Sequence, residues 1–150
     1  MAAVLPRGVR NFNPGNIDYN PRNAWNGQLG LELGVDKPRF ARFDSPENGI
    51  RALGKLLINY RGKDGMPGVG GPGIDTVRET VSRWAPGNEN NTEAYIAAVT
   101  SKLGVKANDV INIKDAKTLR VFVGAIIAHE CANYRYPDAV FNEGIRRALA

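Results

Sequence analysis

An apolar stripe that ends in a carboxylate dominates the last third of the chain. The segment from Asp115 to Ala132 reads DAKTLRVFVGAIIAHECA, and its apolar residues recur at the 3.6-residue period of one helix face. Glu130 falls on that same face, within about 20° of its centre at about 100° per residue. The spacing therefore predicts a buried helix that carries one acidic side chain. The apolar positions are Leu119, Phe122, Val123, Ile126 and Ile127.

The position of Glu130 has two interpretations. A carboxylate in apolar surroundings is costly to ionise, so it tends to keep its proton near neutral pH, as a general acid must. Alternatively, Glu130 lies in the last helical turn and pairs there with His129 or with an arginine from elsewhere in the chain. Periodicity leaves both interpretations open.

The length, cysteine count and net charge of the chain limit the classes of protein to which it can belong. The chain has 150 residues, which suits one domain with its own core, and a single cysteine, Cys131, which excludes an internal disulfide. We expect no signal peptide, and no apolar run approaches the ~18 residues of a membrane span. The net charge of +5 favours a polyanionic partner, either nucleic acid or the bacterial cell envelope. Because the basic residues form no continuous run, we expect no nucleic-acid partner.

Metal and thiol chemistry are disfavoured by the residue counts. One histidine and one cysteine cannot fill a tetrahedral metal site without several carboxylates, so we expect no metal. We also expect no cofactor. His129 and Cys131 lie two positions apart on one helix, where side chains point about 200° apart. That spacing argues against a Cys–His nucleophilic pair.

The remaining chain predicts a mainly α, α+β fold with about five helices. Residues 7–33 are rich in Asn, Gly and Pro, which indicates a structured loop with a short strand near its end. Phe40 and Phe43 bracket a second short strand. Residues 62–73 contain too much glycine for anything but a flexible loop, and a turn is expected at residues 87–91. Besides the Glu130 helix, helices are expected at residues 46–60, 74–85, 92–103 and 137–149.

Amide and aromatic side chains make up a second group of candidates. Asparagine can both donate to and accept from sugar hydroxyls, and aromatic rings pack on the apolar faces of sugars. These residue types favour a carbohydrate ligand, although each of them singly can also serve the core or anchor a loop. The candidates are Asn13, Asn16, Tyr19, Trp25, Trp84, Tyr95, Tyr134 and Tyr136.

Several segments resemble proteins that cleave peptidoglycan. NTEAYIAAV, residues 91–99, resembles the Thr-x-x-Tyr-(Val/Ile)-x-x-Val signature of soluble lytic transglycosylases, in which the tyrosine lies in the glycan cleft. PRFARFDSPENGIRALGKLL, residues 38–57, and NPGNI, residues 13–17, are similar to segments of the flagellar-type glucosaminidases. With RWAPGNENNTEAYI and AIIAHE, the whole arrangement resembles small virion-associated proteins of bacteriophages and prophages.

The resemblance implies a lysozyme-like fold with a rearranged chain order. In these families the catalytic glutamate ends a helix upstream of the Asn-rich segment, but only about a dozen residues precede Asn13 here, and none is acidic. The corresponding helix-end carboxylate is Glu130, near the other end of the chain. We therefore expect a single, circularly permuted lysozyme-like domain over residues 1–150. A fold tolerates circular permutation when its termini lie close together.

The resemblance also implies a function. It predicts a muramidase that cleaves the MurNAc-GlcNAc β-1,4 bond of peptidoglycan, as a phage lytic transglycosylase with Glu130 as its one catalytic acid. Asp18 is the candidate for a second carboxylate if the enzyme is a hydrolase. The residues expected to bind the glycan are Tyr95, Asn16, Asn13 and Tyr134.

These expectations define the partners and the alternatives. We expect a monomer that acts on peptidoglycan glycan strands in the bacterial cell wall without inserting into a membrane. Before lysis it would reside in the phage virion or in the host cytoplasm. Two alternatives stay open: a noncatalytic virion structural or glycan-binding protein that has the fold without the reaction, and a nucleic-acid binder attracted by positive charge.

Overall fold

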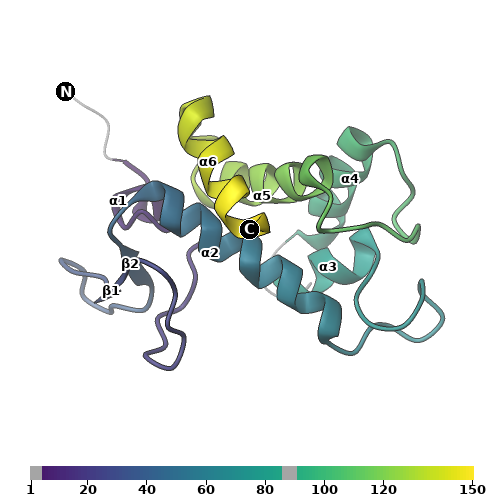
Figure 1. Ribbon diagram of the computed structural model, residues 1–150, viewed down its shortest axis with the longest axis horizontal. Coiled ribbons are helices and arrows are strands. Elements are labelled where there is room, and N and C mark those ends of the chain that lie inside the picture. The colour runs from purple at the N-terminus through teal and green to yellow at the C-terminus, as the bar shows by residue number, and fades with distance from the viewer. Residues whose placement is uncertain (1–4, 86–90) are drawn as a thin grey trace. The chain divides into compact units, whose positions relative to one another are not determined.

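A computed structural model describes residues 5–85 and 91–150 of the chain (Figure 1). These residues form six α-helices, one short 3-10 helix and a two-stranded antiparallel sheet, which confirms the predicted mainly α, α+β class. The predicted turn at residues 87–91 falls outside the described residues except for its last position. The elements are α1 (Arg7–Arg10), β1 (Gln28–Leu31), β2 (Ala41–Phe43), α2 (Pro46–Asn59), η1 (Tyr60–Gly62), α3 (Val77–Trp84), α4 (Thr92–Leu103), α5 (Ala116–Glu130) and α6 (Asp138–Leu149).

The chain divides into two compact units. We call them the outer unit, Met1–Lys55 with Ile126–Ala150, and the middle unit, Leu56–Ala125. Both boundaries fall inside helices, because α2 crosses the first boundary and α5 crosses the second. The outer unit therefore combines the Asn-rich segment with Glu130 and α6.

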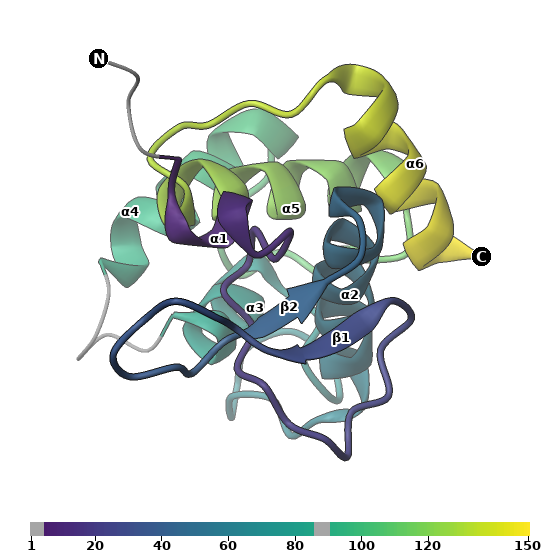
Figure 2. The same ribbon diagram turned by 90° about the vertical axis from the view of Figure 1, so that its left-hand side faces the viewer.

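In the outer unit, the strands form a small antiparallel hairpin beside the first part of α2 (Figure 2). Ala41 and Phe43 of β2 are buried, as are Ile50 and Leu53 of α2, so the hairpin and the helix each bury one apolar side. Ser45 begins α2 as predicted, since its hydroxyl accepts from the Asn48 N–H at 3.2 Å. The strands pair Gln28 with Phe43, Gly30 with Arg42 and Leu31 with Ala41, with a bulge between Gln28 and Gly30.

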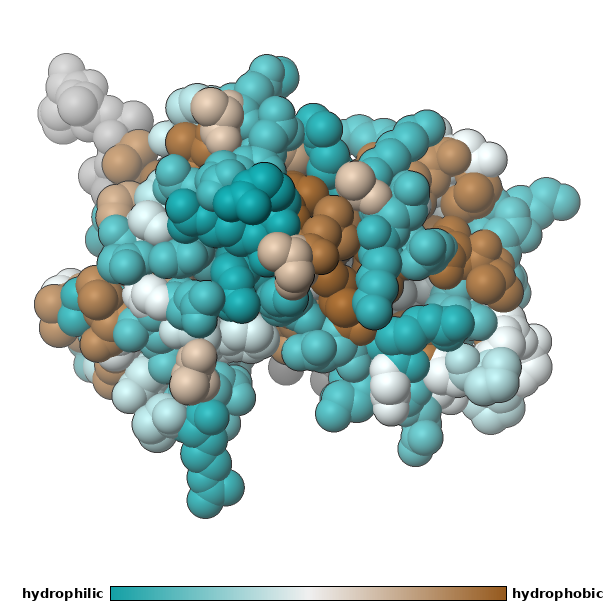
Figure 3. All heavy atoms as spheres, in the orientation of Figure 1, coloured by the Kyte–Doolittle hydropathy of each residue, from teal (hydrophilic) through white to brown (hydrophobic). Residues whose placement is uncertain are grey.

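The hairpin also presents an apolar surface to solvent. Leu29, Leu31 and Leu33 are 54%, 37% and 71% exposed, at alternate positions of the chain. Brown surface lies at the left-hand edge of Figure 3, where Figure 1 shows β1. Glu32, between two of these leucines, is instead turned into the protein and is 3% exposed.

An ion pair between half-exposed Arg7 and buried Glu32 attaches α1 to the hairpin. Arg7 Nε donates to Glu32 Oε1 at 2.8 Å, and the Arg7 guanidinium lies 4.5 Å from the centroid of the Phe40 ring. The hydrogen bond from Arg7 holds the pKa of Glu32 well below its ordinary value, although burial acts in the opposite direction. Smaller contributions come from the Phe40 and Arg39 N–H groups and the Asn11 amide. Helix α1 is one turn long and was not predicted, and this ion pair anchors it.

The middle unit contains the end of α2, η1, α3, α4 and most of α5. Helices α3 and α4 each follow a residue whose side chain caps the first turn. The Thr76 hydroxyl accepts from Glu79 N–H at 3.2 Å, and the Asn91 side chain accepts from Ala94 N–H at 3.1 Å. Gly104 ends α4 with a φ of 70°. The predicted helix positions are therefore confirmed here to within a few residues.

The glycine-rich segment at residues 62–73 follows η1 without further helix or strand, as predicted. Two buried carboxylates nevertheless hold it in place. Glu79, 2% exposed, accepts from the Met66 N–H at 2.8 Å, and Asp75, 4% exposed, accepts from the Gly71 N–H at 2.9 Å. The composition indicated a flexible loop, and the structure shows one anchored to α3 and to the residues just before it. None of the described helices is long and apolar enough to cross a membrane.

Candidate functional site

Glu130, the last residue of α5, meets the Asn-rich segment within the outer unit. Asn16 Nδ2 donates to Glu130 Oε2 at 3.0 Å, although the residues are 114 positions apart. The structure therefore brings the side chains of Glu130 and Asn16 together. Both residues are half-buried, so the carboxylate lies at the edge of the core beside an amide, where periodicity had indicated purely apolar surroundings.

Close packing of α1 against the following turn brings Asn16 to this position. A Cβ atom on Gly8 would lie 2.8 Å from the Asn13 carbonyl oxygen and 2.9 Å from Asn16 Oδ1, so a larger residue does not fit without movement. Cys131, directly after Glu130, donates its thiol to the Pro14 carbonyl at 3.4 Å. Figure 2 shows α1 alongside the C-terminal end of α5. Through these contacts the Asn-rich segment near the start of the sequence packs against the end of α5.

Strained backbone is concentrated around Glu130. Within residues 5–85 and 91–150, the non-glycine residues with positive φ are Phe12 (52°), Asn16 (49°), Ala132 (51°) and Asn133 (63°). Two belong to the Asn-rich segment that contacts Glu130, and two follow Glu130 directly. Such conformations cost about 1 kcal/mol or more for Phe12 and Ala132 and less for the two asparagines; they persist where the surrounding structure holds them, and they cluster at functional sites. Their grouping marks this place as a candidate functional site.

The thiol of Cys131 is not a nucleophile in this site. The residue is fully buried, and this burial, followed by the negative charge of Glu130, raises the pKa of the Cys131 thiol to about 11. Nucleophilic attack requires the thiolate, which is scarce at neutral pH for such a group. Among the described residues, no group of three or more His, Cys, Asp or Glu side chains is placed to hold a metal ion.

Two tyrosines follow the strained turn after Glu130. Tyr134 and Tyr136 pack edge to face, with ring centroids 5.1 Å apart and planes at 77°. Tyr136 is buried, and burial, followed by the neighbouring Cys131 and Tyr134, raises the pKa of its hydroxyl. Tyr134 is half-buried and lies four residues after Glu130, so it stays a candidate glycan ligand.

Asn13 has a different position from the one we expected. It is 0% exposed; its Oδ1 accepts from the Ile17 N–H at 3.0 Å, and its Nδ2 donates to the Ile17 and Ala41 carbonyls at 2.9 Å each. The backbone of the Asn-rich segment and of β2 needs these partners because it is buried. Asn13 therefore shapes the segment that carries Asn16, and we no longer expect it to contact a ligand.

The acidic residues of the Asn-rich segment and hairpin have partners of their own. Arg39 Nε donates to Asp18 Oδ1 at 2.6 Å, and both of these side chains are mostly exposed. Glu32 is enclosed with Arg7, as described above. Asp18 is thus held by an ion pair at the surface, and buried Glu32 by a part-buried one.

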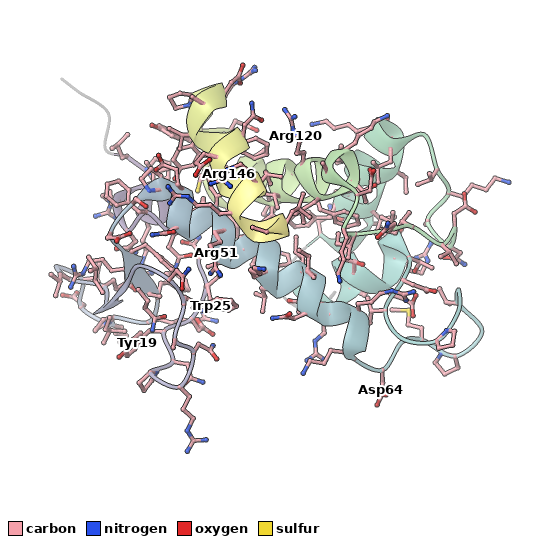
Figure 4. The ribbon with its side chains drawn as sticks, viewed as in Figure 1. Tyr19, Trp25, Arg51, Asp64, Arg120 and Arg146 are labelled. Carbon is pink, nitrogen blue, oxygen red and sulfur yellow. The ribbon has the colours of Figure 1, made fainter. Side chains whose placement is uncertain are left out.

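The other aromatic candidates are distributed over both units. Tyr19 and Trp25 lie in the outer unit, before β1, and are half-buried (Figure 4). Trp84 ends α3 in the middle unit, also half-buried, and Tyr95 lies on α4 of that unit at 5% exposure. The expected role of Tyr95 in glycan binding stays a prediction, because it belongs to the other unit from Glu130.

Comparisons with known proteins agree with a phage relationship. No protein-family model matches the chain. The chain is 37% identical over 108 residues to Protein P5 of Pseudoalteromonas phage PM2, an alignment that covers 71% of this chain and 61% of that protein. The chain thus matches less than two thirds of its relative's length. Its similarity to a bacteriophage protein, which the sequence segments predicted, is confirmed.

Proposed function

We propose that the protein is a phage-associated enzyme that cleaves peptidoglycan glycan strands, with Glu130 as its catalytic acid. The observation that carries the proposal is the hydrogen bond between Asn16 and Glu130. In lysozyme-like enzymes a helix-end glutamate adjoins an Asn-rich segment, and this contact provides the same adjacency with the chain order permuted. The lysozyme-like fold and its circular permutation are part of this proposal.

The geometry at Glu130 defines a possible path for one proton. Oε2 accepts a hydrogen bond from the Asn16 amide, which holds the carboxyl group in one orientation, and this carboxyl group is the proposed proton donor. Glu130 would protonate the glycosidic oxygen between MurNAc and GlcNAc as an oxocarbenium-like transition state develops. The C–O bond to the leaving sugar breaks, and that sugar departs as an alcohol.

A second step needs no further carboxylate. The ionised Glu130 would take the proton from the 6-hydroxyl of the muramyl residue while that oxygen attacks the anomeric carbon, which gives a 1,6-anhydro product and restores the acid. The ion pair of Asp18 with Arg39 and the burial of Glu32 favour this route over a hydrolysis that uses either of them as a second carboxylate. We therefore prefer lytic transglycosylase activity to hydrolysis.

The two alternatives differ in how well the structure supports them. A noncatalytic virion structural or glycan-binding protein would also fit the likeness to a phage protein, whose name states no activity. Nucleic-acid binding has less support, because seven arginines are ion-paired with carboxylates and are less available to phosphates.

Turbidity of purified cell walls tests the proposal. Wild-type protein should clear the suspension, and Glu130→Gln should not, because the amide has the shape of the acid but cannot donate an acidic proton. Glu143→Gln is the matched control, since Glu143 is a helical glutamate of the same unit that pairs with Arg146 and Arg147. Binding of walls without clearing by the wild type would favour the noncatalytic alternative, and steeply salt-dependent DNA retention would favour the nucleic-acid binder.

A further inference from the structure

Phe12 combines two unfavourable features beside the candidate site. It is 39% exposed to solvent, and its backbone has a φ of 52°, which a bulky side chain rarely adopts. Both features lower the stability of the fold, because a partly exposed ring buries less apolar area than a core ring and the backbone is strained. We propose that Phe12 is a glycan-stacking residue, whose ring packs on the apolar face of a sugar in the bound strand. The inference rests on the proposed function.

The surrounding residues impose this conformation on Phe12. Its N–H donates to the Val9 carbonyl at 3.1 Å, at the end of α1. Its own carbonyl oxygen lies only 1.7 Å from where a Cβ atom on Gly49 would be, so α2 packs directly on the Phe12 backbone. The next residue, Asn13, is fixed by three side-chain hydrogen bonds. The turn is therefore held by its backbone, and the ring is directed outward.

The same turn places Phe12 near the proposed acid. Asn16 N–H donates to the Asn13 carbonyl at 3.0 Å, which closes a four-residue turn between them. Chain geometry then limits the Cα atoms of Phe12 and Asn16 to within about 11 Å of each other. Because Asn16 contacts Glu130, the Phe12 backbone lies near the carboxylate, within the span of a few sugar residues of a bound glycan strand.

An aromatic ring suits this ligand. A pyranose sugar has one face lined by C–H groups, and the electron-rich face of an aromatic ring packs well against such a surface. The exposed leucines of the hairpin lack a flat face. Leu33, at 71% exposure in the same unit, therefore serves as a control for general apolar contact.

Binding to purified peptidoglycan sacculi tests the inference in a Glu130→Gln background, where cleavage does not interfere. Co-sedimentation should show about tenfold weaker binding after Phe12→Ala or Phe12→Gly, a change that corresponds to about 1.4 kcal/mol for one aromatic contact. Phe12→Trp should retain binding within about twofold, and so should Leu33→Ala. Phe12→Gly should also unfold at a higher temperature than its parent, because glycine relieves the strain.

The outcomes separate this inference from the proposed function. If the parent binds sacculi and Phe12→Ala binds equally well, Phe12 is not a ligand contact, while the role of Glu130 is unaffected. If Phe12→Gly and Phe12→Trp both lose thermal stability, the ring is a packing element and the inference is wrong. If the parent itself fails to bind sacculi, the proposed function and this inference both fail.

Discussion

The side-chain amide of Asn16 and the carboxylate of Glu130 are hydrogen-bonded at 3.0 Å across 114 positions of the sequence. This contact joins the start and the end of the chain within one unit. One of the two hydrogens on Asn16 Nδ2 is used on the carboxylate, and the expected contact of Asn16 with a glycan stays a prediction. If Glu130 is the proposed acid, Asn16 acts as a positioning residue, which holds the carboxyl group in one orientation.

Substitutions of Asn16 test this role. Asn16→Gly keeps the positive φ but removes the amide, so it should fold normally and lower kcat by about 10- to 1,000-fold, as expected for one oriented hydrogen bond. Asn16→Asp should shift the pH–activity profile to higher pH, because two adjacent carboxylates resist being ionised together. Rates on purified walls over a pH series measure both effects. Full activity of Asn16→Gly would show that the contact has no catalytic importance.

The strained turn after Glu130 predicts a stabilising substitution. Ala132 has a φ of 51°, so Ala132→Gly should raise the free energy of unfolding by about 1 kcal/mol. Ala97→Gly, at an exposed position inside α4, should lower it by about the same amount, because glycine is a poor helix former. Urea unfolding of both variants measures the contrast. A loss of stability in Ala132→Gly would mean that the turn is not strained.

The ion pair between Glu32 and Arg7 should make the free energy of unfolding depend on pH in the acid range. The pKa of Glu32 is lower in the folded chain than its ordinary value of 4.5, mainly because Arg7 donates to it. The stabilisation is therefore present above about pH 4.5 and is lost as the pH falls below that value toward the folded-state pKa. Glu32→Gln should cost about 1–3 kcal/mol at pH 7 and less at pH 3.

Unfolding in urea at the two pH values checks this expectation. Asp18→Asn is the control, because the Asp18–Arg39 pair is exposed and should contribute little at either pH. An effect of Glu32→Gln that is the same at pH 3 and pH 7 would contradict the assigned charge state.

The reactivity of the Cys131 thiol measures how tightly the Asn-rich segment packs against the end of α5. This thiol is fully buried, and its pKa is raised to about 11, first by burial and then by Glu130. A thiol reagent at pH 8 should therefore react slowly with the folded protein and rapidly in urea, where the group is exposed. Ellman's reagent gives this rate directly. Rapid reaction of the folded protein would show that the contact between the Asn-rich segment and α5 opens readily.

Sequence periodicity predicted the helices but not every contact that places the site. Helices α2 to α6 were all expected, because their apolar residues recur at helical spacing and their ends have capping, proline or glycine signals. Helix α1 was missed, since four residues give too little pattern, and it depends on the distant Glu32. Glu130 and Asn16 were identified from spacing and residue type.

The structural settings of Asn13 and Phe12 could not be predicted from the sequence in the same way. The burial of Asn13 depends on the Ala41 carbonyl, 28 positions away. Phe12 gave no signal beyond its place before an Asn-Pro-Gly turn, because positive φ at a phenylalanine follows from packing against Gly49. In both cases the setting of the residue depends on tertiary packing, which a local sequence pattern does not show.

The products released from purified peptidoglycan test the central claim most directly. If Glu130 acts alone as acid and then base, mass analysis of wild-type digests should show muropeptides ending in 1,6-anhydro-MurNAc, lighter by one water than hydrolytic products, and none from Glu130→Gln. Reducing-end MurNAc would contradict the single-carboxylate route. Undiminished product from Glu130→Gln would show that Glu130 is not the catalytic acid.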